Sequence, residues 1–165
     1  MYRKLSLLTL TLILGACAST PQPSTAPAAE KATVASTSAV GETEAQRVDR
    51  IISTLASHSI YFDYNDFTIK PQYMAQLKQD FELLRSAPKV VFMLEGNADD
   101  RGSAEYNLAL GQKRADAVKN ALRALGIPDS QLESISFGKE KPRATCNEEK
   151  CWAENRRVDF SRKMP

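Results

Sequence analysis

The sequence has little of several residue types on which common protein functions depend. It contains one histidine, His58, among 165 residues. Ser-His and Cys-His catalysis need a base that can reach the nucleophile, so a lone histidine offers little basis for either class of enzyme. We interpret His58, which precedes the first expected strand, as a surface residue.

The sequence also lacks a surplus of charge. Its 22 Lys and Arg residues exceed its 20 Asp and Glu residues by two, and Arg3 and Lys4 account for that difference. These two lie in an N-terminal segment without acidic residues, so the rest of the chain is balanced. Nucleic-acid-binding domains usually carry a basic patch, and no nucleic-acid partner is indicated.

No apolar run is long enough to span a membrane. The run at residues 5–14 covers about 10 residues, whereas a spanning helix needs about 20. Basic residues precede it, and the tetrapeptide LGAC at 14–17, which has the form of a bacterial lipobox, ends it. We therefore predict a lipoprotein signal peptide at 1–16 and lipidation of Cys17. The alternative is an ordinary signal peptide with a chance cysteine.

Lipidation would anchor the protein, since each buried methylene contributes about 0.8 kcal/mol. Ala18 follows the cysteine where an Asp could stand, and the sorting rule for such lipoproteins then favours the outer membrane. Residues 17–42 are rich in Ala, Ser, Thr and Pro and cannot bury enough apolar surface to offset their ordering entropy. We expect a lipidated N-terminus and a disordered tether at 17–42, with a folded domain at 43–165 facing the periplasm.

The hydrophobic pattern of residues 43–165 predicts an α+β domain. Helices are expected to begin near Thr43, Pro71 and Ser103. Strands are expected at residues 60–62, 90–96, 135–137 and 158–160. We expect a small mixed four-stranded sheet with the helices packed on one side. The run at 90–96 is apolar on both faces, which predicts a central, covered strand.

The third expected helix carries two neighbouring stripes. The predicted core stripe consists of Leu108, Gly111, Ala115, Val118, Leu122 and Leu125. Beside it, Asn107, Leu110 and Arg114 follow at spacings of 3 and 4 and would line a groove outside the core.

Charge gathers just before this helix, in Asn97, Asp99, Asp100 and Arg101. Asp99 would face the groove lined by Arg114. If the two groups do not simply neutralise each other, the carboxylate can bind the ammonium of a zwitterion and the guanidinium its carboxylate. The alternative is a set of solvated charges at the helix start.

Two cysteines, Cys146 and Cys151, lie in the expected loop before the last strand. An oxidising periplasm would let them form a disulfide, which we predict, although so short a loop contributes only about 2 kcal/mol in the chain-entropy model. A metal clip is the alternative. Two thiolates without a nearby histidine or further cysteine make up half a zinc site.

Four segments resemble the OmpA-like peptidoglycan-binding domain family in sequence and order: YFDYNDFTIKP, LEGNADDRGSAEYNLALGQKRADAVKNAL, LGIPDSQLESISFGKEKP and NRRVDF. With the lipobox and tether, the chain resembles the peptidoglycan-associated lipoproteins of the Tol-Pal system. The resemblance implies a noncatalytic domain, without metal or cofactor, that binds meso-diaminopimelate of the peptidoglycan stem. Such a protein would tether the outer membrane to the cell wall and support envelope integrity and cell division.

The resemblance also implies a binding site for diaminopimelate, whose side chain ends in an ammonium and a carboxylate. The family's ligand-binding Asp falls on Asp99 and its Arg on Arg114. The other positions implied to line the pocket are Asp63, Gly96, Ser103, Asn107 and Leu110. Where the family commonly has His, this chain has Asn97, which cannot titrate near neutral pH. Ligand contacts of Asn97, Arg156 and Tyr106 stay open.

The resemblance implies the periplasmic propeller protein TolB as a partner that competes for the peptidoglycan-binding surface, and leaves open which other Tol components bind. Two alternatives remain. One is an OmpA-like lipoprotein outside the Tol system. The other is a periplasmic hydrolase that uses Glu95, Asp99 and Asp100 as acid, base or metal ligands.

Overall fold

The computed structural model describes residues 42–163. The predicted signal peptide, Cys17 and all but the last residue of the predicted tether lie outside this range. Among the helices of residues 42–163, none has the length and apolar character needed to cross a membrane.

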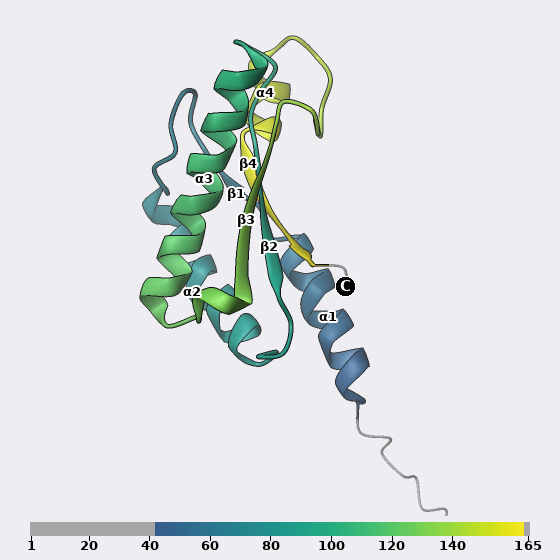
Figure 1. The fold of residues 1–165 in the computed structure, drawn as a ribbon. Coiled ribbons are helices and arrows are strands. Elements are labelled where there is room, and N and C mark those ends of the chain that lie inside the picture. The colour runs from purple at the N-terminus through teal and green to yellow at the C-terminus, as the bar shows by residue number, and fades with distance from the viewer. Residues whose placement is uncertain (1–41, 164–165) are drawn as a thin grey trace, which may run out of the picture. The chain divides into compact units, whose positions relative to one another are not determined.

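The predicted helices and strands follow one another in the predicted order, with the helix α4 and two short 3-10 helices, η1 and η2, in addition (Figure 1). The elements are α1 (Glu44–Ala56), β1 (Ile60–Tyr61), η1 (Pro71–Tyr73), α2 (Met74–Arg85), β2 (Phe92–Asn97), α3 (Ala104–Leu125), η2 (Asp129–Gln131), β3 (Leu132–Gly138), α4 (Glu149–Asn155) and β4 (Arg157–Arg162). The short helix α4 occupies part of what the sequence analysis took for a loop.

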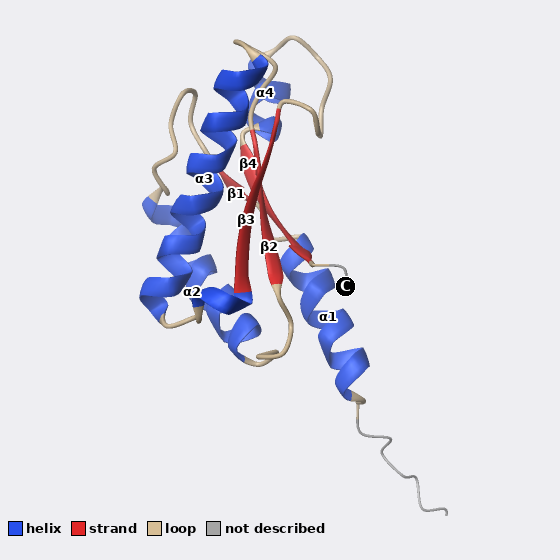
Figure 2. Ribbon diagram, viewed as in Figure 1, coloured by secondary structure: helices blue, strands red, loops and turns tan. Residues whose placement is uncertain are grey.

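The strands form one mixed sheet in the order β1-β4-β2-β3 (Figure 2). Strand β2 runs parallel to β3 and antiparallel to β4. The predicted α+β class with a four-stranded mixed sheet is therefore confirmed.

Local signals account for the helix ends. The Thr43 side chain accepts a hydrogen bond from the Gln46 backbone N–H, and the Gln46 side chain accepts one in return from the Thr43 N–H, which completes a capping box. Ser103 caps α3 in the same way by accepting from the Tyr106 N–H. Gly126 ends α3 with φ of 117°, a left-handed conformation that favours glycine.

One face of the sheet packs against the helices to form the core. Leu94 on β2 and Phe160 on β4 belong to the same buried cluster as Leu55 of α1, Leu77 of α2 and Val118 of α3. Burial of such side chains contributes about 1.5–3 kcal/mol each. This cluster fixes the strand on which the candidate site is built.

Strand β2 is central, as predicted, but only one of its faces is covered by helices. On the other face Met93 and Glu95 are half-buried. The Glu95 carboxylate accepts hydrogen bonds there from Lys141 Nζ at 2.8 Å and Ser161 Oγ at 2.5 Å. The expectation of a fully covered strand was wrong because hydrogen-bonded polar side chains occupy that face.

The buried face of α3 differs from the prediction. Leu108 is 53% exposed and does not belong to the core. The buried residues of α3 are Asn107, Leu110, Gly111, Arg114, Ala115, Val118 and Leu122. A Cβ atom at Gly96 would lie 1.9 Å from the Gly111 carbonyl oxygen, so helix and strand meet backbone to backbone here. This contact turns Arg114 inward and Leu108 outward.

His58 was also predicted wrongly, as a surface residue. Its side chain is 26% exposed, and its Nδ1 lies 2.6 Å from Oδ1 of Asp80, whose side chain is fully buried. Burial raises the pKa of Asp80, and the hydrogen bond from His58 opposes that shift only in part. The pair joins the end of α1 to α2.

Candidate ligand-binding site

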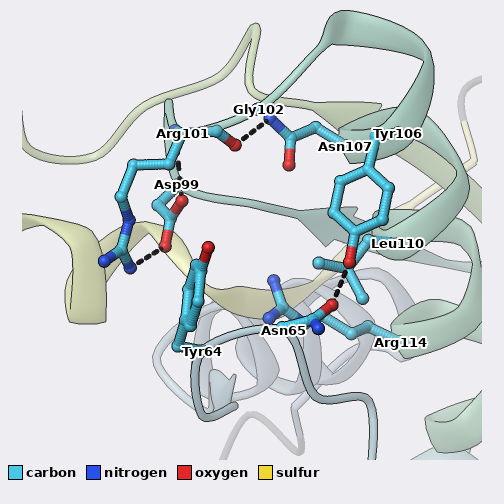
Figure 3. A pocket seen from close by; sticks show the side chains of 9 residues that line it. All are labelled: Tyr64, Asn65, Asp99, Arg101, Gly102, Tyr106, Asn107, Leu110 and Arg114. Atoms are coloured by element: carbon cyan, nitrogen blue, oxygen red, sulfur yellow. Dashed lines mark hydrogen bonds and ion pairs between the residues drawn. The ribbon is translucent and has the colours of Figure 1, made fainter.

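A pocket of about 100 Å³ lies where β2 leads into α3. Loop residues after β1, the β2–α3 loop and the first turns of α3 supply its lining. The lining residues are Tyr64, Asn65, Asp99, Arg101, Gly102, Tyr106, Asn107, Leu110 and Arg114. Figure 3 shows their side chains around the opening, with Asp99 and Arg101 on one side and Tyr106 and Leu110 on the other. Four of the seven predicted ligand residues therefore share one pocket: Asp99, Asn107, Leu110 and Arg114.

Arg114 is fully buried and connects the segments that form this pocket. Its Nε donates to the Asp66 carbonyl at 2.8 Å, its Nη1 to the Asn97 carbonyl at 2.9 Å and its Nη2 to the Asp63 carbonyl at 3.0 Å. Because these carbonyls belong to the loop after β1 and to the end of β2, one guanidinium holds both in place. The prediction that Arg114 lies outside the packed interior was wrong.

The Arg114 guanidinium keeps its charge and part of its hydrogen-bonding capacity. Burial, together with the nearby charge of Arg156, lowers the pKa of Arg114 to about 10, so the group is protonated at neutral pH. A guanidinium has five N–H donors, and three of them donate to backbone carbonyls. Among residues 42–163, no side chain or carbonyl accepts a hydrogen bond from the other two.

Asp99 is 4% exposed and is held by two arginines. Its Oδ1 accepts from the Arg101 backbone N–H at 3.2 Å, and its Oδ2 accepts from Arg101 Nη2 at 2.5 Å and Arg156 Nη1 at 3.3 Å. Burial alone would raise the pKa of Asp99, but the hydrogen bonds and charge of the arginines outweigh it and lower that pKa. Asp99 is thus an ionised, oriented acceptor.

A family model described as the OmpA family matches residues 61–156. The chain belongs to the OmpA family. Two relatives are peptidoglycan-associated lipoproteins: that of Agrobacterium fabrum is 41% identical over 99 residues, 60% of this chain and 56% of the relative, and that of Pseudomonas putida is 44% identical over 102 residues, 62% and 61% respectively. The matches thus span less than two thirds of these relatives.

Solved structures agree with this assignment. The crystal structure of the peptidoglycan-associated lipoprotein from Burkholderia pseudomallei is 48% identical, with a TM-score of 0.62, and covers 64% of this chain and 89% of that one. The C-terminal domain of Helicobacter pylori MotB, at 22% identity, a TM-score of 0.60 and coverage of 65% and 84%, shares the fold.

Three predicted ligand residues of this OmpA-family domain do not line the pocket. The Asp63 carboxylate accepts from Lys70 Nζ at 2.6 Å and is 66% exposed, while its backbone carbonyl accepts from Arg114. Gly96 packs on α3, and Ser103 caps that helix. All three support the geometry of the pocket from outside its lining.

Residues left open by the sequence analysis have defined positions. The Tyr106 hydroxyl lies in the pocket lining and donates to Asn65 Oδ1. Arg156 Nε donates to the Phe62 carbonyl at 3.0 Å in addition to its bond with Asp99. Asn97 is 1% exposed, and its side chain donates to the Glu95 carbonyl at 2.9 Å. Arg156 and Asn97 lie outside the lining.

Four lining residues were not predicted from the sequence: Tyr64, Asn65, Arg101 and Gly102. Tyr64 and Asn65 belong to the family segment YFDYNDFTIKP, and Arg101 belongs to the charged loop before α3. The family segment and the charged loop could therefore have indicated these residues. Asn65 has φ of 54°, an uncommon conformation for a residue other than glycine. It places the loop after β1 against α3, which the spacing of residues could not predict.

Proposed function

We propose that this OmpA-family domain binds peptidoglycan through meso-diaminopimelate and is not an enzyme. The observation that carries the proposal is the presence, in one small pocket, of the Asp99 carboxylate and an Arg114 guanidinium whose hydrogen-bonded partners are all backbone carbonyls. A carboxylate entering the pocket would give Arg114 an anionic partner. The names of the relatives, peptidoglycan-associated lipoproteins, support the same ligand.

The chemistry of each lining group suits one part of the ligand. The terminal carboxylate of diaminopimelate would accept hydrogen bonds from the two remaining N–H groups of Arg114. The neighbouring ammonium would donate to Asp99, and the ligand methylenes would contact Leu110. Because the protein's own hydrogen bonds already hold Asp99 and Arg114, binding orders few additional side chains, which favours affinity.

The positions of the carboxylates favour binding over hydrolysis. Glu95 pairs with Lys141 and Ser161 on the sheet face away from the helices, Asp99 is engaged by arginines in the pocket, and Asp100 is exposed. The three groups that a hydrolase would need do not converge. Among residues 42–163 no group of three or more His, Cys, Asp or Glu side chains is arranged to hold a metal ion.

A binding titration tests the ligand. The domain is titrated by calorimetry with a muropeptide that contains meso-diaminopimelate, with its amidated form and with a lysine-containing stem. The amidated stem lacks the negative charge of the terminal carboxylate, and the lysine stem lacks that carboxylate altogether, so both should bind at least tenfold more weakly. Equal affinity for all three stems would refute recognition of the zwitterion.

We further propose that the chain is an outer-membrane lipoprotein of the Tol-Pal system. In this proposal residues 1–16 are removed, Cys17 is lipidated, residues 17–42 form the tether, and TolB competes with peptidoglycan for the domain. Capture from an envelope extract, with and without added muropeptide, tests the partner. TolB should be captured and then displaced by muropeptide. Capture without TolB would favour an OmpA-like lipoprotein outside the Tol system.

A further inference from the structure

The Arg101 side chain lies between two aromatic rings. Its guanidinium carbon is 4.1 Å from the centroid of the Tyr64 ring and 4.1 Å from that of the Trp152 ring. From this position its Nη2 donates to Asp99 Oδ2 at 2.5 Å. The two rings therefore fix the plane from which Arg101 holds the carboxylate of the candidate site.

The two rings differ in their relation to the pocket. Tyr64 lines it, together with Arg101 and Asp99, whereas Trp152 is not one of the lining residues. Trp152 belongs to α4, directly after Cys151, whose sulfur is bonded to that of Cys146. Its indole thus supports Arg101 from outside the binding space.

A freely rotating Arg101 would hold Asp99 less well. Arginine has a long side chain with many rotamers, and a partly exposed ion pair must restrict them to persist. The Arg101 side chain is 30% exposed, and a planar guanidinium bonds a carboxylate well only when the two groups are aligned. Stacking on Trp152 supplies that restriction without occupying the pocket.

We propose that Trp152 is a positioning residue that acts on the ligand site through Arg101 and Asp99. This inference rests on the proposed function for its effect on affinity. The expected effect of Trp152 on Asp99 does not depend on the proposed function, because that effect is present without ligand. The two effects can therefore be measured separately.

The affinity test compares Trp152→Leu, which removes the ring, with Trp152→Phe, which keeps a ring that can stack. Titration with the diaminopimelate muropeptide should show about fivefold weaker binding for the leucine variant, the size expected for one lost cation–π contact. The phenylalanine variant should recover most of that loss. Phe137→Leu is the matched control, because it removes a ring stacked on Lys141 at 4.0 Å and lies outside the pocket lining.

A double-mutant cycle separates positioning from general support. If Trp152 acts through Arg101, Trp152→Leu should cause no further loss of affinity in an Arg101→Ala background. A loss of the same size in both backgrounds would overturn the inference. If the wild-type domain itself does not bind the muropeptide, the proposed function fails, and the inference is decided by the measurement without ligand.

That measurement is the titration of the Asp99 carboxyl group by NMR. Arg101 lowers the pKa of Asp99, so Trp152→Leu should raise that pKa towards its ordinary value, whereas Trp152→Phe and Phe137→Leu should not. Trp152 is the only tryptophan of the chain, so its fluorescence should also change in Arg101→Ala. An unchanged Asp99 pKa in well-folded Trp152→Leu would overturn the inference.

Discussion

Replacement of Arg114 by alanine should destabilise the domain as well as abolish ligand binding. The side chain is 0% exposed, and its removal takes a donor from the Asn97 carbonyl through a buried bond and from the Asp63 and Asp66 carbonyls through part-buried bonds, although the Asp63 carbonyl still accepts from the Asp66 N–H at 3.3 Å. A buried acceptor that loses its partner costs about 1–3 kcal/mol. If water satisfies some of the three, the free energy of unfolding should still fall by about 3–5 kcal/mol.

Thermal unfolding followed by circular dichroism measures this effect. For a domain of this size the loss corresponds to a fall in Tm on the order of 10–20 °C. Arg123→Ala is the matched control, because Arg123 lies on the same helix, is 49% exposed and pairs with Asp129 at 3.2 Å. Surface substitutions of this kind change stability by about 0.5 kcal/mol or less. An Arg114→Ala variant as stable as Arg123→Ala would refute the role assigned to the three hydrogen bonds.

The binding part of the prediction is measured below the unfolding temperature of the variant. Loss of the guanidinium leaves the ligand carboxylate unpaired, which costs about 2–5 kcal/mol, or about thirtyfold or more in affinity. Arg114→Ala should cause little further loss with the amidated stem, because that stem has no carboxylate for the guanidinium to hold. An equal loss with both stems would mean that Arg114 only supports the loop.

Three further predictions concern anchoring, covalent state and pH. Cys17→Ala should give a soluble periplasmic protein that still binds isolated sacculi, and loss of sacculus binding would contradict separate anchor and domain. The intact mass measured without reductant should be lower than that of the reduced chain by two hydrogens, because Cys146 and Cys151 form a disulfide. A mass that corresponds to two free thiols would contradict the disulfide. Burial raises the pKa of Asp80 above 3.8, so the stability that this group contributes is lost as the pH rises through its folded-state pKa. Asp80→Asn should therefore be at least as stable as wild type at neutral pH by thermal unfolding, and a Tm several degrees lower would contradict this.

Features that depend on local sequence could be predicted. The spacing of apolar residues gave the three long helices and the strands, and Thr43 and Ser103 marked helix starts because their side chains bond to N–H groups three residues later. The family motifs placed Asp99 and Arg114 in one pocket. Each of these inferences uses residues that are close in sequence or joined by a known motif.

Features that depend on packing could not be predicted. The two stripes of α3 are one residue apart, and residues of both are buried because Gly96 and Gly111 let the helix approach the strand closely, while Leu108 is left exposed. Arg156 reaches Asp99 across 57 positions of sequence. The contact between His58 and Asp80 spans 22 positions. No periodicity in the sequence carries information on such pairs.

Packing also changes how the ligand hypothesis has to be tested. Asp99 and Arg114 are the two charged groups proposed to bind the zwitterion, and both are also hydrogen-bonded within the domain. A single alanine substitution at either site therefore alters support and recognition together, and reduced affinity alone cannot separate them. Variation of the ligand leaves every internal hydrogen bond of the protein unchanged. Discrimination by the wild-type domain between free and amidated stems is for this reason the decisive measurement, and the mutants show which side chain produces it.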